Sequence, residues 1–319
     1  MTIAYDLPFE RWAFNAKVRG ELPTHQAAEL DWAEGLLFTP ELVPSVSHPL
    51  VARRGPEASR WLLAQALFTN LEFTQVLEHE VVNHAVYSIA RGRSGFDLPP
   101  AMVADAWNIL VDESYHGKIT ADLSRLAEAR TGILNQAPKV PAFFLRLQRE
   151  VARADPALRP LLPIFFCSIS ETLITKNLVE VPRDPRVIAP VRQVMKDHAE
   201  DESKHHRFFA SFISQAWPQL PETFKAQIGP LLPKFMAIFI DPDIVAVRSQ
   251  LRQIGLGEDD AQQVIFDCYS ESSLAESRRN GARASLSALR KAGVAGSAHL
   301  RDEMHRYGLS MDVPEGVAA

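Results

Sequence analysis

The stretch His198-Ala-Glu-Asp-Glu-Ser-Lys-His205 decides the fold, because it interrupts the apolar face of a predicted helix with polar side chains at helical spacing. His198, Glu202 and His205 follow one another at positions i, i+4 and i+7, which share one face of an α-helix. Val194 and Phe209 continue that face on either side, and apolar side chains in such a stripe face the core of a protein. The sequence therefore predicts two histidines and a glutamate that point into the interior of a helical protein.

Part of this stretch is repeated earlier in the chain. Asp201-Glu-Ser-Lys-His205 corresponds to Asp112-Glu-Ser-Tyr-His116, and both segments contain the pattern Glu-x-x-His. A spacing of three residues puts the carboxylate and the imidazole on the same side of a helix. Because the apolar Ile109 precedes the earlier segment on the same face, we expect Glu113 and His116 to point inward as well.

Two further long helices each contribute one inward glutamate. No proline or glycine occurs between Pro56 and Gly92, and the apolar stripe of that stretch reaches Glu78. Glu171 follows Ile164 at helical spacing in a later apolar stretch. The predicted long helices cover about 56–92, 99–132, 158–181 and 186–217, with shorter helices at about 27–37 and 140–154 and further helices over 221–310.

Seven polar side chains are thus predicted to face one core. They are Glu78, Glu113, His116, Glu171, His198, Glu202 and His205. A buried ionised carboxylate costs several kcal/mol unless it is paired or bound to a cation. One glutamate from each of two helices, with Glu-x-x-His from each of two others, is the ligand arrangement of ferritin-like di-metal bundles. Mixed oxygen and nitrogen ligands suit iron or manganese.

The predicted fold class is therefore all-α, with a ferritin-like four-helix bundle as its core. We expect the bundle to occupy about residues 57–217, with extra N- and C-terminal helices in 1–56 and 218–319. Because all four helices are needed to close the site, the flanks are predicted to cover the bundle. The whole chain, 1–319, is then expected to form a single domain.

Composition excludes several other classes of protein. The net charge of −5 argues against a protein that coats nucleic acid, which needs a basic face. The two cysteines, Cys167 and Cys268, give neither a disulfide scaffold nor a thiolate zinc site, and they indicate a reducing compartment. The longest apolar stretch, 161–169, is too short to span a membrane, and no secretory signal is visible. We expect a cytoplasmic protein without membrane or nucleic-acid partners.

The extra histidine at 198, seven residues before His205, makes the sequence resemble the di-iron N-oxygenases typified by p-aminobenzoate N-oxygenase. The resemblance spans roughly residues 30 to 310 and includes Leu42-Val-Pro-Ser-Val-Ser-His-Pro-Leu50. It implies that the seven side chains named above are the ligands of two iron ions. It also implies O₂ as cosubstrate, oxidation of an amine to a hydroxylamine, nitroso or nitro product, an external electron donor such as a reductase or ferredoxin, a role in secondary metabolism, and a homodimer.

One departure from that family concerns the substrate. The aminobenzoate enzyme is thought to use a basic residue about one helical turn before the first glutamate ligand to meet the substrate carboxylate. The corresponding position here is Phe73, with Thr74 and Leu77 nearby. We therefore expect a less polar or differently charged amine, with arylamines favoured, and we predict that these residues line the substrate pocket together with Tyr115.

Two aspartates complete the predicted site. Asp112 and Asp201 precede the glutamates of the two Glu-x-x-His patterns, and each could accept an N–H bond from a ligand imidazole on the facing helix and so fix its tautomer. Two other functions stay open at this point. One is a di-iron oxygenase acting at a C–H bond. The other is an iron-storage or iron-sensing bundle, which the roughly 100 residues after the fourth helix disfavour because they could wall off a substrate pocket.

Overall fold

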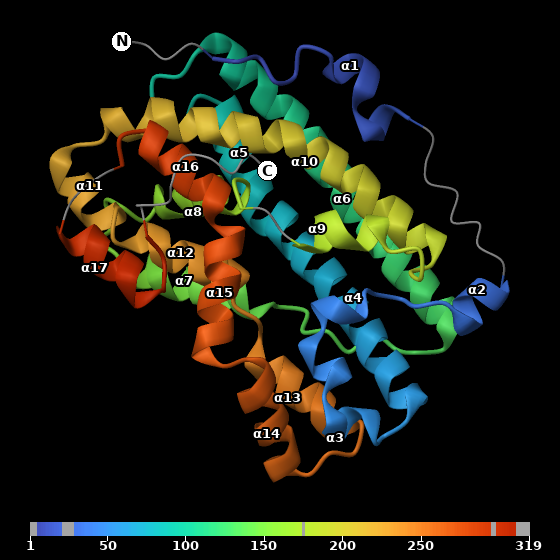
Figure 1. Ribbon diagram of the computed structural model, residues 1–319. Helices are drawn as coiled ribbons and strands as arrows, with labels where there is room; N and C mark the ends of the chain where they lie inside the picture. The colour runs from blue at the N-terminus through green and yellow to red at the C-terminus, as the bar shows by residue number, and fades with distance from the viewer. Residues whose placement is uncertain (1–4, 21–28, 174–175, 295–297, 311–319) are drawn as a thin grey trace.

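A computed structural model describes residues 5–20, 29–173, 176–294 and 298–310 of the chain (Figure 1). The described part is helical, with no strand, and one isolated parallel bridge joins Leu36 to Val187. The all-α prediction is confirmed. The main helices before residue 217 are α4 (Pro56–Leu77), α5 (Asn83–Ala90), α6 (Pro100–Thr131), α7 (Ala142–Arg153), α8 (Leu162–Ser170) and α10 (Ala189–Ala216).

The first long helix contains a wider turn that the sequence did not predict. Helices α4 and α5 are joined without a loop by a π-helical turn, Glu78–Val82. A proline in the first turn begins α4, because its missing N–H needs no partner there. The π turn begins at Glu78 itself, and such turns inside α-helices often occur at functional sites. It sets the direction in which this glutamate leaves the helix.

Helices α6 and α10 form the centre of the bundle. Helix α6 packs against α4 and α5 on one side and against α10 on the other. It begins at Pro100 and ends at Gly132, whose φ of 70° gives the left-handed cap that glycine adopts without strain. The bounds of α6 and α10 lie close to the predicted ones, 99–132 and 186–217.

The prediction of one continuous helix over 158–181 is wrong. Helix α8 ends at Ser170, Glu171 follows it, and the next helix is the short α9 (Lys176–Glu180). Ser168, Ser170 and Thr172 each donate a side-chain hydrogen bond to a backbone carbonyl three or four residues earlier. Such bonds compete with the helical ladder. The same bonds occur inside the unbroken α6, for example from Thr120, so they accompany the break without explaining it.

The N-terminal flank crosses the bundle in two pieces. Residues 5–20, which we call the strap, contain α1 (Trp12–Asn15) and a 3₁₀ turn, Lys17–Arg19, that contacts α6. The predicted helix near 27–37 corresponds to α2 (Glu29–Glu34), and residues 27 and 28 lie outside the described part. After two 3₁₀ turns, Pro40–Leu42 and Pro44–Ser47, the short α3 (Pro49–Ala52) leads into α4.

The C-terminal helices cover one side and one end of the bundle. They are α11 (Glu222–Ile228), α12 (Leu231–Ile240), α13 (Ile244–Gln253), α14 (Glu258–Cys268), α15 (Glu271–Gly281), α16 (Arg283–Lys291) and α17 (Ala298–Arg306). Helix α12 packs on α7 and α8, and α16 packs on α10. Helices α13 and α14 lie beside α3 (Figure 1) and share a small apolar cluster with it that includes Val51 and Leu251.

The largest apolar cluster joins the flanks to the bundle. It contains Phe9 of the strap, Phe209 of α10, Phe235 of α12 and Leu309 after α17. Among the described helices, none combines the length and apolar character needed to cross a membrane.

Candidate metal centre

The seven predicted side chains converge between α4, α6, α8 and α10 as two adjacent groups. Site A consists of Glu78, His116, His198 and Glu202. Its possible ligand atoms lie within 4.8 Å of one another. His198 Nε2 is 3.0 Å from a carboxylate oxygen of Glu78 and 3.0 Å from one of Glu202, while His116 Nδ1 is 3.7 Å from Glu202.

Site B consists of Glu113, Glu171, Glu202 and His205, and it meets the same distance limit. His205 Nδ1 lies 3.0 Å from Glu113, 3.3 Å from Glu202 and 3.8 Å from Glu171. Glu202 belongs to both sites, and one of its oxygens, Oε1, is the atom that lies near His116, His198 and His205. Each site holds carboxylates together with at least one imidazole, a donor set suited to iron.

The local structure explains how glutamates from different kinds of element meet here. Glu78 opens the π turn and Glu171 directly follows the last residue of α8, so both stand where the regular α-helical ladder is interrupted. Glu113 and Glu202 lie in unbroken helices, each three residues before the histidine of its own repeat. The two repeats therefore face each other across the α6–α10 contact.

Several buried ligand atoms at the site lack a hydrogen-bond partner and so fit a bound cation. Glu78 Oε2, Glu113 Oε1, Glu171 Oε2 and His205 Nδ1 are buried and have no partner in hydrogen-bonding geometry, although His205 Nδ1 and Glu113 Oε1 lie 3.0 Å apart. Leaving such groups unpaired costs about 1–3 kcal/mol each, and more when they are charged. All four belong to the two groups, and their oxygens and nitrogen are of the kind that a metal ion would satisfy. The residues present therefore fit a pair of metal ions.

Proton affinities at the site are strongly shifted. Burial, reinforced by the nearby Glu202 and Glu113, holds the pKa of Glu171 well above its usual range. Burial raises the pKa of Glu78 to about 7. For His205, burial opposes the charged form, but Glu113 and Glu202 outweigh it and raise the pKa of the imidazole well above its usual value. Without metal, protons take the place of cations in balancing the buried carboxylates.

The outer nitrogens of two histidines face aspartates, as the sequence suggested. His116 Nε2 lies 3.2 Å from Asp201, and His205 Nε2 lies 3.4 Å from Asp112. In each pair the aspartate comes from the facing helix. The inner nitrogen, Nδ1, is thereby left toward the glutamates.

Three contacts with this system were missed in the sequence. Trp12 donates its indole N–H to both carboxylate oxygens of Asp112, at 2.8 and 2.9 Å. Phe9 stacks on the ring of His205, with centroids 5.9 Å apart and planes at 19°. Lys204, buried within the second repeat, donates to Asp201 at 2.6 Å. Lys204 was visible inside the motif, whereas no periodicity links the strap to a site about 100 residues later.

The residues predicted to line a substrate pocket lie in two different places. Phe73 packs against Phe143 and Phe239, with ring centroids 4.4 and 5.2 Å apart, on the side of the bundle covered by α7 and α12. Leu77 belongs to the same apolar cluster, and Thr74 is buried nearby in α4. Tyr115 instead lies in a second apolar cluster with Leu71 and Val194. No described cavity joins the four.

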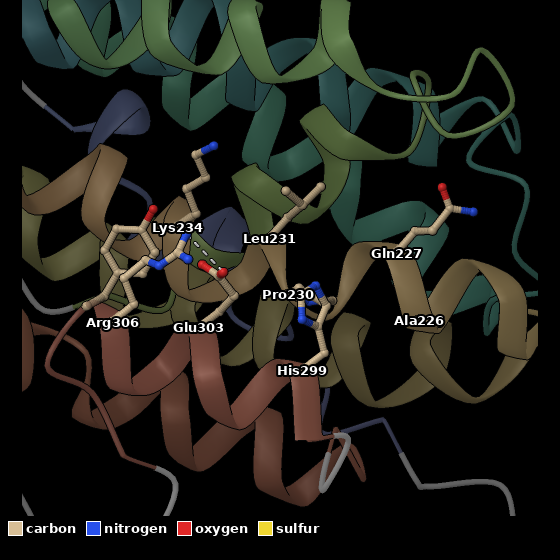
Figure 2. A pocket seen from close by; sticks show the side chains of 9 residues that line it. Ala226, Gln227, Pro230, Leu231, Lys234, His299, Glu303 and Arg306 are labelled. Atoms are coloured by element: carbon tan, nitrogen blue, oxygen red, sulfur yellow. Dashed lines mark ion pairs between the residues drawn. The ribbon is translucent and has the colours of Figure 1, made fainter.

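A surface pocket of about 380 Å³ lies elsewhere, between α11, α12 and α17 (Figure 2). Its lining includes His299, Tyr307, Lys234, Glu303 and Arg306, and none of the seven site residues. Its charges are already neutralised, because Arg306 pairs with Glu303 and Lys234 pairs with Glu150. It is separate from the metal centre.

Comparison with known proteins assigns the family. A family model for p-aminobenzoate N-oxygenase AurF matches residues 24–293, and no curated protein sequence matches the chain. One similar solved structure is described as protein 19 with aldehyde deformylating oxidase activity from Synechococcus. The two share 15% sequence identity with a TM-score of 0.41, over 76% of this chain and 98% of that one. On the match over most of its length, this chain belongs to the p-aminobenzoate N-oxygenase family of di-iron oxidoreductases.

Proposed function

We propose that this chain holds one iron ion in site A and one in site B and uses them with O₂ to N-oxygenate an amine, giving a hydroxylamine, nitroso or nitro product. The observation that carries the proposal is the convergence of Glu78, Glu113, Glu171, Glu202 and three histidines with buried, unpartnered ligand atoms. A bound pair of iron ions would supply the electrons that activate O₂.

The chain's own side chains would control water and protons at this centre. His116, His205 and Glu113 are fully buried, so bulk water is kept from that side. Glu202 is the most open of the four glutamates, with 21% of its side chain exposed. We therefore infer that small molecules approach from the Glu202 side. Glu171, whose pKa is raised, would release its proton when a cation binds.

For the substrate we propose an arylamine without a carboxylate. Five residues before Glu78, Phe73 contacts two further aromatic rings, and Phe143 also stacks on Phe166 at 6.2 Å. These four rings offer apolar surface and carry no charge that could pair with a carboxylate. Such surroundings favour a neutral aromatic ring over an aminobenzoate.

Metal stoichiometry tests the centre. Anaerobic titration of the purified protein with Fe(II) should bind two ions per chain and give a transient visible absorption when O₂ is added. The His198→Ala variant should bind one ion more weakly and lose N-oxygenation while keeping its helical circular dichroism. The matched control is His84→Ala, which removes an exposed histidine of α5 outside both sites and should bind two ions normally. Wild-type binding of one ion, or none, would overturn the proposal.

An amine panel tests the reaction. We would supply the iron-loaded protein and a chemical reductant with aniline-type amines, p-aminobenzoate and alkylamines, and read the products by mass and by nitrogen-bound oxygen. Products oxygenated at nitrogen, formed faster from the uncharged arylamines, are expected. Oxygen found only on carbon would make the protein a C–H oxygenase, and iron uptake without any organic product would favour storage.

We also propose the partners and the setting of this activity. An external reductase or ferredoxin would re-reduce the iron, and the chain would act as one domain in a homodimer. The shared apolar cluster from Phe9 to Leu309 supports the single domain. Both cysteines are free, which suits the reducing cytoplasm. Light scattering of the full chain measures the oligomeric state, and a monomer would contradict the dimer.

A further inference from the structure

The strap contacts the metal centre through Trp12 and Phe9, and Trp12 does so by a hydrogen bond. The indole N–H of Trp12 donates to both oxygens of Asp112, at 2.8 and 2.9 Å, and Asp112 is fully buried. The same carboxylate lies 3.4 Å from His205 Nε2. Trp12, Asp112 and His205 thus form a chain of contacts from the outer strap to a side chain of site B.

The aspartates of the two repeats have different hydrogen-bond donors. In the second repeat, Lys204 lies three residues after Asp201 and donates to it within the same helix. The equivalent position in the first repeat is Tyr115, which packs into an apolar cluster. Helix α6 therefore lacks an internal cation for Asp112. Trp12, 100 residues away in the chain, supplies a neutral N–H donor to Asp112 instead.

A second strap residue contacts the same histidine. Phe9 is buried and lies parallel to the His205 ring, whereas the neighbouring Tyr5 donates to Asp105 of α6 at 2.8 Å and has no contact with either site. The strap is further fixed to α10 by the ion pair of Lys17 with Asp197 at 3.2 Å. The strap thus contacts the ring face of His205 through Phe9 and reaches its outer nitrogen, Nε2, through Trp12 and Asp112.

We propose that Trp12 is a positioning residue for the metal centre, acting through Asp112 to keep His205 Nδ1 directed at site B. The proposal rests on the proposed function, because it assumes that site B binds a cation. Partners that fix the outer nitrogen of a ligand histidine typically change metal affinity 10–100-fold. Residues 5–20 lie outside the stretch 24–293 that the family model matches, so this support comes from a part of the chain that the family match does not cover.

The test compares two strap variants of the full-length protein. Trp12→Phe removes the donor to Asp112, and Tyr5→Phe removes a strap–α6 hydrogen bond of the same length, 2.8 Å, that does not reach a ligand. Co(II) binding to each is measured by competition with a chromophoric chelator. We expect Trp12→Phe to weaken the binding of one of the two Co(II) ions several-fold, less than the about 10–100-fold typical when the histidine's own partner is lost, and to change the visible Co(II) absorption. Tyr5→Phe should bind both ions like the wild type.

The outcomes separate this inference from the proposed function. Equal affinities in all three proteins, or equal losses in both variants, would mean that the strap acts only by general packing and would overturn the inference. A wild-type protein that fails to bind two Co(II) ions would overturn the proposed function and the inference with it. A double-mutant cycle gives an independent measure: in an Asp112→Ala background, which leaves no acceptor for the indole, Trp12→Phe should cause no further loss, and additive losses would contradict the route through Asp112.

Discussion

His116 Nε2 lies 3.2 Å from Asp201 Oδ2, so the imidazole of one repeat is held by the aspartate of the other. The reverse pair, His205 with Asp112, crosses the same helix contact in the opposite direction at 3.4 Å. In each copy of the Asp-Glu-x-x-His segment, the glutamate and the histidine point into the site. The aspartate of each copy contacts the histidine of the other copy. Neither repeat is complete without the other.

Asp201→Asn should weaken metal binding at site A. The amide keeps the size of the side chain but removes the charge that holds His116 and pairs with Lys204. We expect a loss of about 10–100-fold in affinity for one of two Co(II) ions, measured by chelator competition. Asp122→Asn is the control, because Asp122 is on α6 and pairs only with the exposed Lys118 and Arg125. Unchanged binding in Asp201→Asn would contradict the crosswise support.

The metal-free protein should lose stability as the pH rises from about 6 to 9. Burial raises the pKa of Glu78 to about 7. Burial and His198 oppose the charged form of His116, but its bonds to Asp201 and Glu113 raise its pKa to about 9. A pKa that is higher in the folded than in the unfolded chain gives stability below the unfolded value, and this is lost as the pH passes through the folded value.

Thermal unfolding in the presence of a chelator measures this loss. We expect the melting temperature to fall by several degrees between pH 6 and pH 9. With metal bound, cations replace those protons, so the loaded protein should keep its melting temperature over the same range. A chelated protein that is more stable at pH 9 than at pH 6 would show that these groups do not carry the raised pKa values.

The sequence predicted the parts of the fold that follow helical periodicity. Helices α6 and α10 lie near their predicted bounds because proline and glycine mark their ends and apolar residues recur along one face. The break after Ser170 was missed because neither proline nor glycine marks it in the sequence. The π turn at Glu78 was missed because buried apolar residues flank it on both sides, Leu77 before it and Val81 and Val82 within it, so the apolar pattern shows no interruption.

For the candidate site, the sequence predicted which side chains meet but not everything that holds them. The seven residues and the two aspartates lie in periodic helices or next to their ends, so spacing alone placed them together. Trp12 and Phe9 lie in a segment with a single short helix, whose path over the bundle depends on tertiary contacts. Local spacing carries no information about such contacts.

Gly117→Ala should gain less than the about 1 kcal/mol by which alanine normally exceeds glycine inside a helix. A Cβ on Gly117 would lie 2.0 Å from Nε2 of the exposed His79, whose ring must move away from α6 to make room. We expect the single variant to melt close to the wild type. The double variant with His79→Ala should melt at or above the His79→Ala single variant. A raised melting temperature in Gly117→Ala alone would mean that His79 moves aside without cost.

Arg278→Met should lower the free energy of unfolding more than the loss of an exposed ion pair does. Arg278 is 4% exposed and donates to both oxygens of Asp241, at 2.7 Å each, and to Glu271 at 2.7 Å. This fork ties α15 to the end of α12, and losing it leaves Asp241 without its cation. We expect a loss of about 2–3 kcal/mol, slightly below the range for fully buried pairs because Asp241 keeps some solvent contact. Arg248→Met is the control, since its partner Glu258 is exposed, and it should cost less than about 1 kcal/mol. Urea unfolding curves of both variants give the comparison, and equal losses would show that the Arg278 pair contributes no more than a surface contact.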